Sequence, residues 1–179
     1  MKRTFVSLAA VSLLLTPVVS FGFELPPNDG YVTDSTGLLS IDQDATLETE
    51  LSTYDTTTTN QIVVVIVQSL SGASIQDVSQ QALAKWHVSD KGALMLVSYA
   101  DHTLWITAGK TLQTTLTDVV VKGIIDTDVI PAFREGKYND GIRAGITAIE
   151  KHISGEYTPQ RYAKKSSSSV AAWMFLFVF

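Results

Sequence analysis

Three aspartates are the candidate ligands for a hard metal cation. Asp34 lies in a D-x-x-G turn, Asp101 follows an apolar run, and Asp90 lies in the loop before that run. Carboxylate oxygens are the ligands that Ca²⁺ and Mg²⁺ prefer in proteins. Asp34, Asp101 and Asp90 therefore form a candidate metal site. Each also has a structural interpretation, because a turn aspartate commonly bonds the backbone of its own turn.

Other reactive side chains give weaker signals. The chain has no cysteine, which excludes disulfides, thiolate catalysis and cysteine-ligated metals. The histidines, His87, His102 and His152, contain no H-x-x-x-H pair that would indicate zinc. His102 beside Asp101 could donate a proton to a phosphate group, and Arg134 could bind one. A surface histidine in a turn and a surface arginine are the alternative interpretations.

One short acidic motif is rejected as a catalytic site. The segment 126–128, DTD, is similar to the D-x-D motif of haloacid-dehalogenase-type phosphatases. That motif requires a preceding strand early in the fold, whereas the residues here belong to a helical pattern before Pro131. We therefore predict that Asp126 and Asp128 lie on a solvated helix face.

Composition limits the classes of partner. The 179 residues contain 45% hydrophobic residues, enough for one globular domain with a substantial core. There are 18 acidic and 13 basic residues, so the formal net charge is −5. No basic stripe interleaved with aromatic residues is present, and we therefore expect no nucleic-acid partner.

The two ends of the chain indicate export and membrane association. Residues 1–22 have a basic start, an apolar stretch and small residues before a cleavage site, which is typical of a signal peptide. Residues 23–30 form a linker. At the other end, a polar linker, 158–169, leads to an apolar tail, 170–179, half the length of about 20 residues that a spanning helix needs. We expect a periplasmic or extracytoplasmic protein, with this tail as an interfacial anchor or a truncated membrane helix, and a membrane or membrane-protein complex as partner.

The chain is organised around the segment Gln61–Leu70. Its core, Ile62–Val67, is six consecutive β-branched residues, which favours a strand covered on both faces. Ala93–Val97 predicts a second buried strand parallel to the first, and Leu104–Ile106 a returning antiparallel strand. Tyr31–Val32 predicts a short edge strand. The fold class is therefore α/β, a three-layer α/β/α sandwich on a small mixed sheet with a parallel βαβ unit and an antiparallel hairpin.

The helices that cover this sheet have local start signals. Ser40 with Gln43 predicts a capping box at the first helix, and Ser74 with Asp77 caps a second helix between the two buried strands. A third helical pattern over 118–128 is expected to end or kink near Pro131. We expect the last helix to be capped at 139–140. Its apolar side consists of Ile142, Ile146, Ile149 and Ile153.

Four segments in this order resemble the TPM domain family over residues 31–157. They are YVTDSTGLLS, QIVVVIVQSLSGASIQDVSQQALAKW, GALMLVSYADHTLWITAG and VIPAFREGKYNDGIRAGITAI. The resemblance implies an exported α/β/α domain, often followed by a membrane helix. Some members of the family are reported as acid phosphatases, and some bind calcium-like cations through loop carboxylates.

The signal-like start, the apolar tail and the resemblance together leave three candidate functions. The first is an accessory module in envelope or membrane-protein maintenance that binds Ca²⁺ or Mg²⁺ through loop carboxylates. The second is a metal-dependent phosphomonoesterase of the acid phosphatase kind. The third is a structural domain without a ligand. This chain differs from the family pattern in the short loop WHVSDKG and at the hairpin tip, Asp101-His102.

Overall fold

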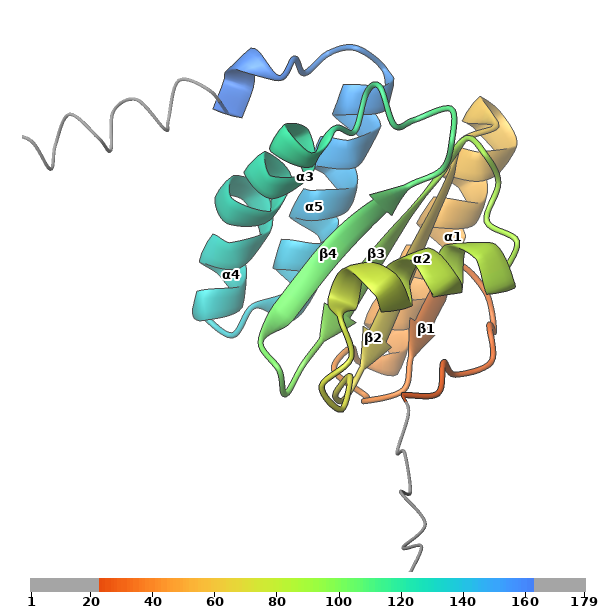
Figure 1. Ribbon diagram of the computed structural model, residues 1–179, viewed down its shortest axis with the longest axis vertical. Coiled ribbons are helices and arrows are strands. Elements are labelled where there is room, and N and C mark those ends of the chain that lie inside the picture. The colour runs from red at the N-terminus through yellow and green to blue at the C-terminus, as the bar shows by residue number, and fades with distance from the viewer. Residues whose placement is uncertain (1–22, 163–179) are drawn as a thin grey trace, which may run out of the picture.

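The computed structural model describes residues 23–162, which form one mixed four-stranded sheet with helices on both faces (Figure 1). The strand order is β1-β2-β3-β4, so the chain adds each strand beside the previous one. The first three strands are parallel, and β4 is antiparallel to β3. The strands are β1 (Val32–Asp34), β2 (Gln61–Val67), β3 (Gly92–Ser98) and β4 (Thr103–Ala108).

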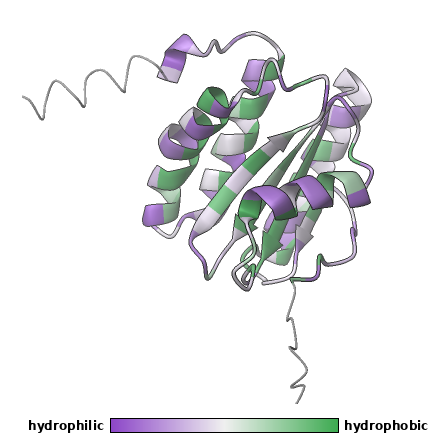
Figure 2. Cartoon of the chain, in the orientation of Figure 1, coloured by the Kyte–Doolittle hydropathy of each residue, from purple (hydrophilic) through white to green (hydrophobic). Residues whose placement is uncertain are grey.

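The two central strands are buried on both faces, as their apolar runs predict. In β2, the side chains of Ile62 and Val64 join one core, and those of Val63 and Val65 join the other. This separation follows from the alternation of side chains along a strand. Figure 2 shows the same arrangement as apolar strands between helices whose outer faces are hydrophilic. The predicted α/β fold with a parallel βαβ unit and an antiparallel hairpin is confirmed.

The two helical layers are unequal. Helix α2 packs on one face of the sheet, and the other helices pack on the opposite face (Figure 1). The larger layer buries its core against even-numbered residues of β2. The helices are α1 (Ile41–Thr58), α2 (Ile75–Lys85), α3 (Asp118–Ile124), α4 (Ile130–Arg134) and α5 (Tyr138–Ile153), with a π-helical segment η1 (Ile125–Val129) between α3 and α4.

The ends of the first two helices follow the predicted caps. The Ser40 side chain accepts the backbone N–H of Gln43, and the Gln43 side chain accepts the backbone N–H of Ser40. Ser74 likewise accepts the backbone N–H of Asp77 at the start of α2. These bonds satisfy helix N–H groups that have no partner inside the helix.

The predicted cap of the last helix is wrong. Helix α5 begins at Tyr138, and no side chain caps it. Gly136 adopts a φ of 73°, which lets the chain reverse immediately after α4. The Tyr138 ring then packs edge-on against Phe133 with ring centroids 5.2 Å apart. This packing starts the helix before Asn139 and places that residue in the first turn.

Pro131 does not end the third helix. The chain continues from α3 through η1 into α4, where Pro131 occupies the first turn. In a regular α-helix the proline ring collides with the carbonyl four residues earlier and one hydrogen bond is lost. The π-helical turn just before Pro131 is wider than an α-turn. It accommodates the ring without a break in the helical path.

The prediction of a solvated face at 126–128 holds for Asp126 only. Asp126 forms an exposed ion pair with Lys122 at 3.2 Å. Asp128 instead accepts the Arg161 guanidinium at 2.7 Å and the Tyr162 hydroxyl at 2.9 Å. Tyr162 is buried, so the start of the predicted linker 158–169 packs on the folded body. Long-range packing of this segment shields most of the Asp128 side chain from solvent.

The predicted membrane elements lie outside the described residues. The signal peptide, 1–22, and the apolar tail, 170–179, both fall outside residues 23–162. Among the helices of residues 23–162, none has the length and apolar character to cross a bilayer.

Candidate functional site

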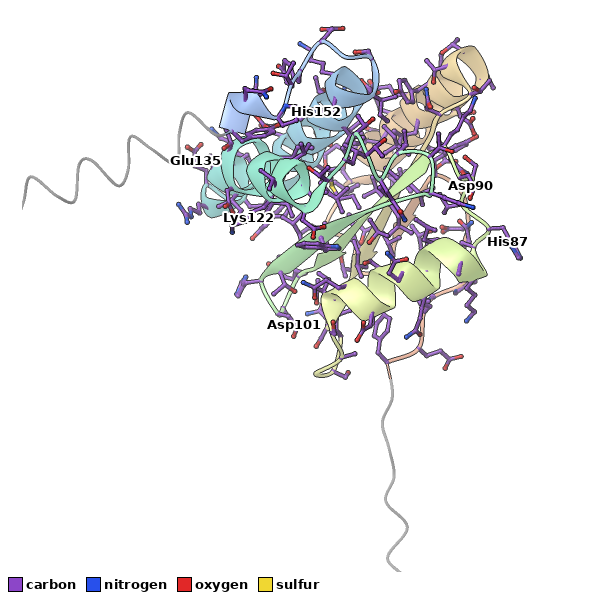
Figure 3. The ribbon with its side chains drawn as sticks, turned by 45° about the horizontal axis from the view of Figure 1, so that its top comes forward. His87, Asp90, Asp101, Lys122, Glu135 and His152 are labelled. Carbon is purple, nitrogen blue, oxygen red and sulfur yellow. The ribbon has the colours of Figure 1, made fainter. Side chains whose placement is uncertain are left out.

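Asp101 lies at the tip of the β3–β4 hairpin, just beyond the carboxyl end of β3 (Figure 3). Its Oδ2 atom accepts the backbone N–H of Leu70 at 2.6 Å and the Ser98 hydroxyl at 2.6 Å. Its Oδ1 atom accepts the Ser69 hydroxyl at 2.9 Å. The carboxylate therefore joins the loop after β2 to the end of β3, at the edge where open α/β sheets usually bind ligands.

These hydrogen bonds favour the ionised form of Asp101. The backbone N–H of Leu70 is the largest cause that lowers the pKa of the Asp101 carboxyl, followed by the hydroxyls of Ser98 and Ser69. His102 adds a smaller effect in the same direction. Because the residue is exposed, one face of an anionic carboxylate remains accessible to solvent.

Asp34 lies at the same end of the sheet, as the last residue of β1. Its Oδ1 atom accepts the N–H and hydroxyl of Thr36, at 2.8 and 2.6 Å, and the N–H of Gly37 at 3.1 Å. Its Oδ2 atom accepts the N–H of Leu39 at 2.8 Å. A carboxylate offers about four acceptor positions. Asp34 uses its own for the loop before α1, whereas Asp101 keeps one free.

Asp90 lies at the opposite end of the sheet from the other two aspartates. It precedes β3, near His87, whereas Asp101 follows that strand (Figure 3). The three predicted ligands therefore do not converge. Among residues 23–162, no group of three or more His, Asp or Glu side chains could hold a metal ion together. Of the three predicted ligands, Asp101 and Asp34 share the carboxyl end of the parallel strands, and their carboxylate oxygens are of the kind that a hard cation prefers.

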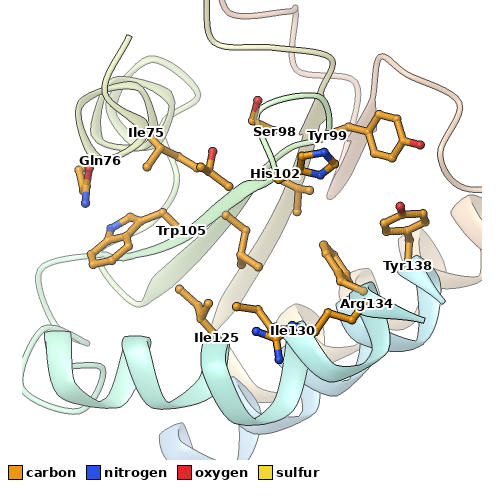
Figure 4. A pocket seen from close by; sticks show the side chains of 14 residues that line it. Ile75, Gln76, Ser98, Tyr99, His102, Trp105, Ile125, Ile130, Arg134 and Tyr138 are labelled. Atoms are coloured by element: carbon orange, nitrogen blue, oxygen red, sulfur yellow. The ribbon is translucent and has the colours of Figure 1, made fainter. Parts of the chain in front are cut away.

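A cleft of about 670 Å³ opens beside the hairpin (Figure 4). Its walls come from the start of α2, the hairpin, and the face of η1, α4 and α5 that points toward β4. The lining is mostly apolar with a few polar groups, which is the usual character of a ligand site. The labelled residues are Ile75, Gln76, Ser98, Tyr99, His102, Trp105, Ile125, Ile130, Arg134 and Tyr138.

Polar side chains come from several walls of the cleft, with Gln76 on α2, His102 on the hairpin and Arg134 on α4 (Figure 4). His102 and Arg134 both line the cleft, and Ser98, a hydrogen-bond partner of Asp101, lines it too. Arg134 is exposed and forms no ion pair with any residue of 23–162. The Arg134 guanidinium, the His102 imidazole and an apolar wall thus line the same cleft. The arrangement suits an anionic or partly apolar ligand.

The sequence alone did not predict this cleft. Trp105 is interpreted most simply as a core residue, but it is only half-buried and lines the cleft. One signal was available, since TLWITA lacks the charged residues that commonly protect an outer strand. Ile130 and Arg134 reach the same space only because the helical path continues past Pro131.

Comparison with known proteins agrees with the fold. The N-terminal domain of a protein from P. gingivalis is 26% identical, with a TM-score of 0.65 over 70% of this chain and 83% of its own. The N-terminal domain of a Corynebacterium glutamicum protein is 16% identical, with a TM-score of 0.55 over 78% and 89%. The BA42 protein from Bizionia argentinensis is 15% identical, with a TM-score of 0.56 over 66% and 83%.

A match to a protein-family model identifies the family of this chain. No curated protein matches the chain in a sequence search. The model of the TPM domain matches residues 32–152, which is more than half of the chain and includes all four strands. The chain therefore belongs to the TPM domain family.

Proposed function

We propose that this TPM-domain protein is an exported, membrane-associated accessory module that binds a divalent cation, Ca²⁺ or Mg²⁺, at the carboxyl end of its sheet. The observation that carries the proposal is the Asp101 carboxylate, which is exposed, kept anionic and fixed in place by the Leu70 N–H and two serine hydroxyls. Asp34 supplies the second carboxylate at the same end. The signal-like and apolar termini support export and membrane association.

The geometry supports weak rather than tight binding. Asp34 already accepts four hydrogen bonds, so it must release some of them to bind a cation. With two carboxylates, the remaining ligands would be hydroxyls, carbonyls and water. Cation sites of exported modules with few charged ligands have dissociation constants of about 0.1–1 mM. We therefore expect saturation in the millimolar range.

Calorimetry and thermal unfolding of the full chain in mild detergent test this proposal. Ca²⁺ and Mg²⁺ are titrated into the wild type, Asp101→Asn, Asp34→Asn and the matched control Asp90→Asn. A ligand that prefers the folded state raises the melting temperature. We expect a saturable rise in the wild type and Asp90→Asn that is lost in Asp101→Asn. Each variant is compared with itself without cation, because Asp101→Asn also loosens the loop.

If the melting temperature does not change at a cation concentration 10-fold above about 1 mM, the proposal is contradicted, because sites of this class are saturated at that concentration. An equal shift in all four proteins would also contradict it, since it would place the cation elsewhere.

A metal-dependent phosphomonoesterase is the second candidate, favoured by the position of Arg134 and His102 in the cleft beside Asp101. Arg134 would bind the phosphate group, and His102 would donate a proton to the leaving oxygen. Hydrolysis of p-nitrophenyl phosphate by the wild type, Arg134→Gln and His102→Asn tests this. Activity that requires added Mg²⁺ and falls in both variants would support the enzyme; no turnover in the wild type would leave the binding module alone.

A further inference from the structure

The outer edge of β4 is unpaired among the described residues. β4 is the last strand of the sheet, with β3 on one side only. In an antiparallel pair, alternate residues exchange their N–H and C=O bonds with the partner strand. The Gly109 N–H donates to the Gly92 carbonyl at 2.7 Å. Every second residue before Gly109 therefore bonds to β3, namely Thr107, Trp105 and Thr103. The N–H and C=O groups of Leu104, Ile106 and Ala108 therefore point away from β3.

None of these outward groups has a hydrogen-bond partner within residues 23–162. Proteins commonly protect such an edge with a lysine, a proline, a bulge or a covering loop. The β4 sequence, TLWITA, contains neither a charged residue nor proline, and its register with β3 is continuous. The edge therefore keeps the full capacity to pair with another strand.

A groove follows this edge along its whole length. The cleft of about 670 Å³ covers the start of β4, and a second hollow of about 380 Å³ covers its end. Both are lined by Trp105, so they meet at the middle of the strand. Helix α2 forms one wall through Gln76 and Gln80, and the path from α3 to α4 forms the other (Figures 1 and 4).

The charges at the two ends of the groove differ. Arg134, which has no ion-pair partner among residues 23–162, lines the end beside the hairpin. Asp118 lines the other end. A bound peptide segment with a carboxylate near Arg134 would be attracted to the positive end of the groove and kept away from Asp118 at the other end. The apolar side chains between the two ends, such as Ile75 and Ile130, match apolar residues of that chain.

We propose that the free edge of β4 binds an extended segment of a partner protein, which adds to the sheet as a fifth strand. The backbone groups of Leu104, Ile106 and Ala108 supply the hydrogen bonds, and the groove walls select side chains, as in other cases of strand addition. The partner segment alternates apolar residues and carries an aspartate or glutamate opposite Arg134. This binding needs no cation, so it is independent of the carboxylate site.

A library of random ten-residue peptides displayed on phage provides the probe. It is selected on the full chain in mild detergent with EDTA present, and enriched sequences are synthesised with amidated carboxyl ends. Affinities are measured by fluorescence anisotropy. We expect alternating apolar sequences with an acidic residue on one side, and replacement of that residue by glutamine should weaken binding severalfold.

Two variants test the edge and the charge separately. Ala108→Pro removes one outward N–H and blocks the edge without breaking the ladder to β3, because proline is tolerated on edge strands. It should weaken binding at least 10-fold. Arg134→Glu should weaken acidic peptides severalfold, while the control Lys85→Glu, an equal charge change on α2 outside the groove, should not. Circular dichroism verifies that each variant is folded.

Three results would overturn the proposal. The library could yield no enriched sequence on the wild type. Enriched peptides could bind folded Ala108→Pro as tightly as the wild type, which would place them away from the edge. Sedimentation could show that the wild type dimerises and that Ala108→Pro is monomeric, which would make a second copy of this chain the occupant of the groove.

Discussion

The backbone N–H of Leu70 donates to the Asp101 carboxylate over 2.6 Å, which joins the loop after β2 to the tip of the β3–β4 hairpin. Two residues 31 positions apart in the chain thus hold the rim of the candidate site. The Ser98 hydroxyl reaches the same oxygen at 2.6 Å. A loop fixed in this way is prepared for ligand binding without a large change in shape.

Asp101→Asn is expected to lower the melting temperature and to flatten its dependence on acid pH. The folded-state pKa of Asp101 is lowered, so its contribution to stability is full above the unfolded value of about 3.9 and is lost as pH falls through the folded value. Thermal unfolding from pH 6 to pH 2 measures this. If the wild type and Asp101→Asn have the same melting temperature at every pH, both below and above about pH 4, the Asp101 carboxylate has no structural role.

The buried hydroxyl pair between α2 and β4 predicts an asymmetric double-mutant cycle. Ser79 and Thr107 share a hydrogen bond of 2.6 Å, and Ser79 also donates to the Gln76 carbonyl. Ser79→Ala leaves the buried Thr107 hydroxyl without that bond and should cost about 1–3 kcal/mol. Thr107→Val should cost less, and the double variant should recover part of the loss. Urea unfolding of all four proteins gives the coupling; strictly additive losses would mean that the pair does not interact.

Gly109→Ala is expected to destabilise the sheet. A Cβ atom at this position would lie 2.6 Å from the Ser89 carbonyl oxygen and 2.7 Å from that of Asp90. Both are backbone atoms, so the strand must shift, at a cost of about 1–3 kcal/mol. Gly72→Asn serves as control, because that position is open and asparagine tolerates its φ of 84°. Denaturant unfolding should show the larger loss at Gly109.

We expect His152 to lower the stability of the fold in mild acid. Burial is the main cause that lowers its pKa, and the charge of Arg161 acts in the same direction, while Asp128 opposes them. Because the folded pKa lies below the unfolded value of about 6.5, the unfolded state binds the proton first, and stability is lost as pH falls below that value. Urea unfolding at decreasing pH should show a smaller loss for His152→Gln. If the free energy of unfolding depends on pH with the same slope in the wild type and in His152→Gln, another group is responsible for the loss.

Several features follow from the sequence because they depend on neighbouring residues. The β-branched run Ile62–Val67 is short for a buried helix, and its continuous apolar character favours a strand covered on both faces. Ser40 caps α1 through a residue three positions away, which is a local geometry. The position of Asp101 beyond the carboxyl end of β3 follows from the same strand pattern. The metal site itself remains a prediction.

Other features depend on contacts between distant segments. The partial burial of Asp128 requires Arg161 and Tyr162, which are more than 30 positions away. The groove along β4 needs α2 and the helical path past Pro131 on its two sides. Local propensity acts over a few residues, whereas these arrangements are decided by packing across the whole core.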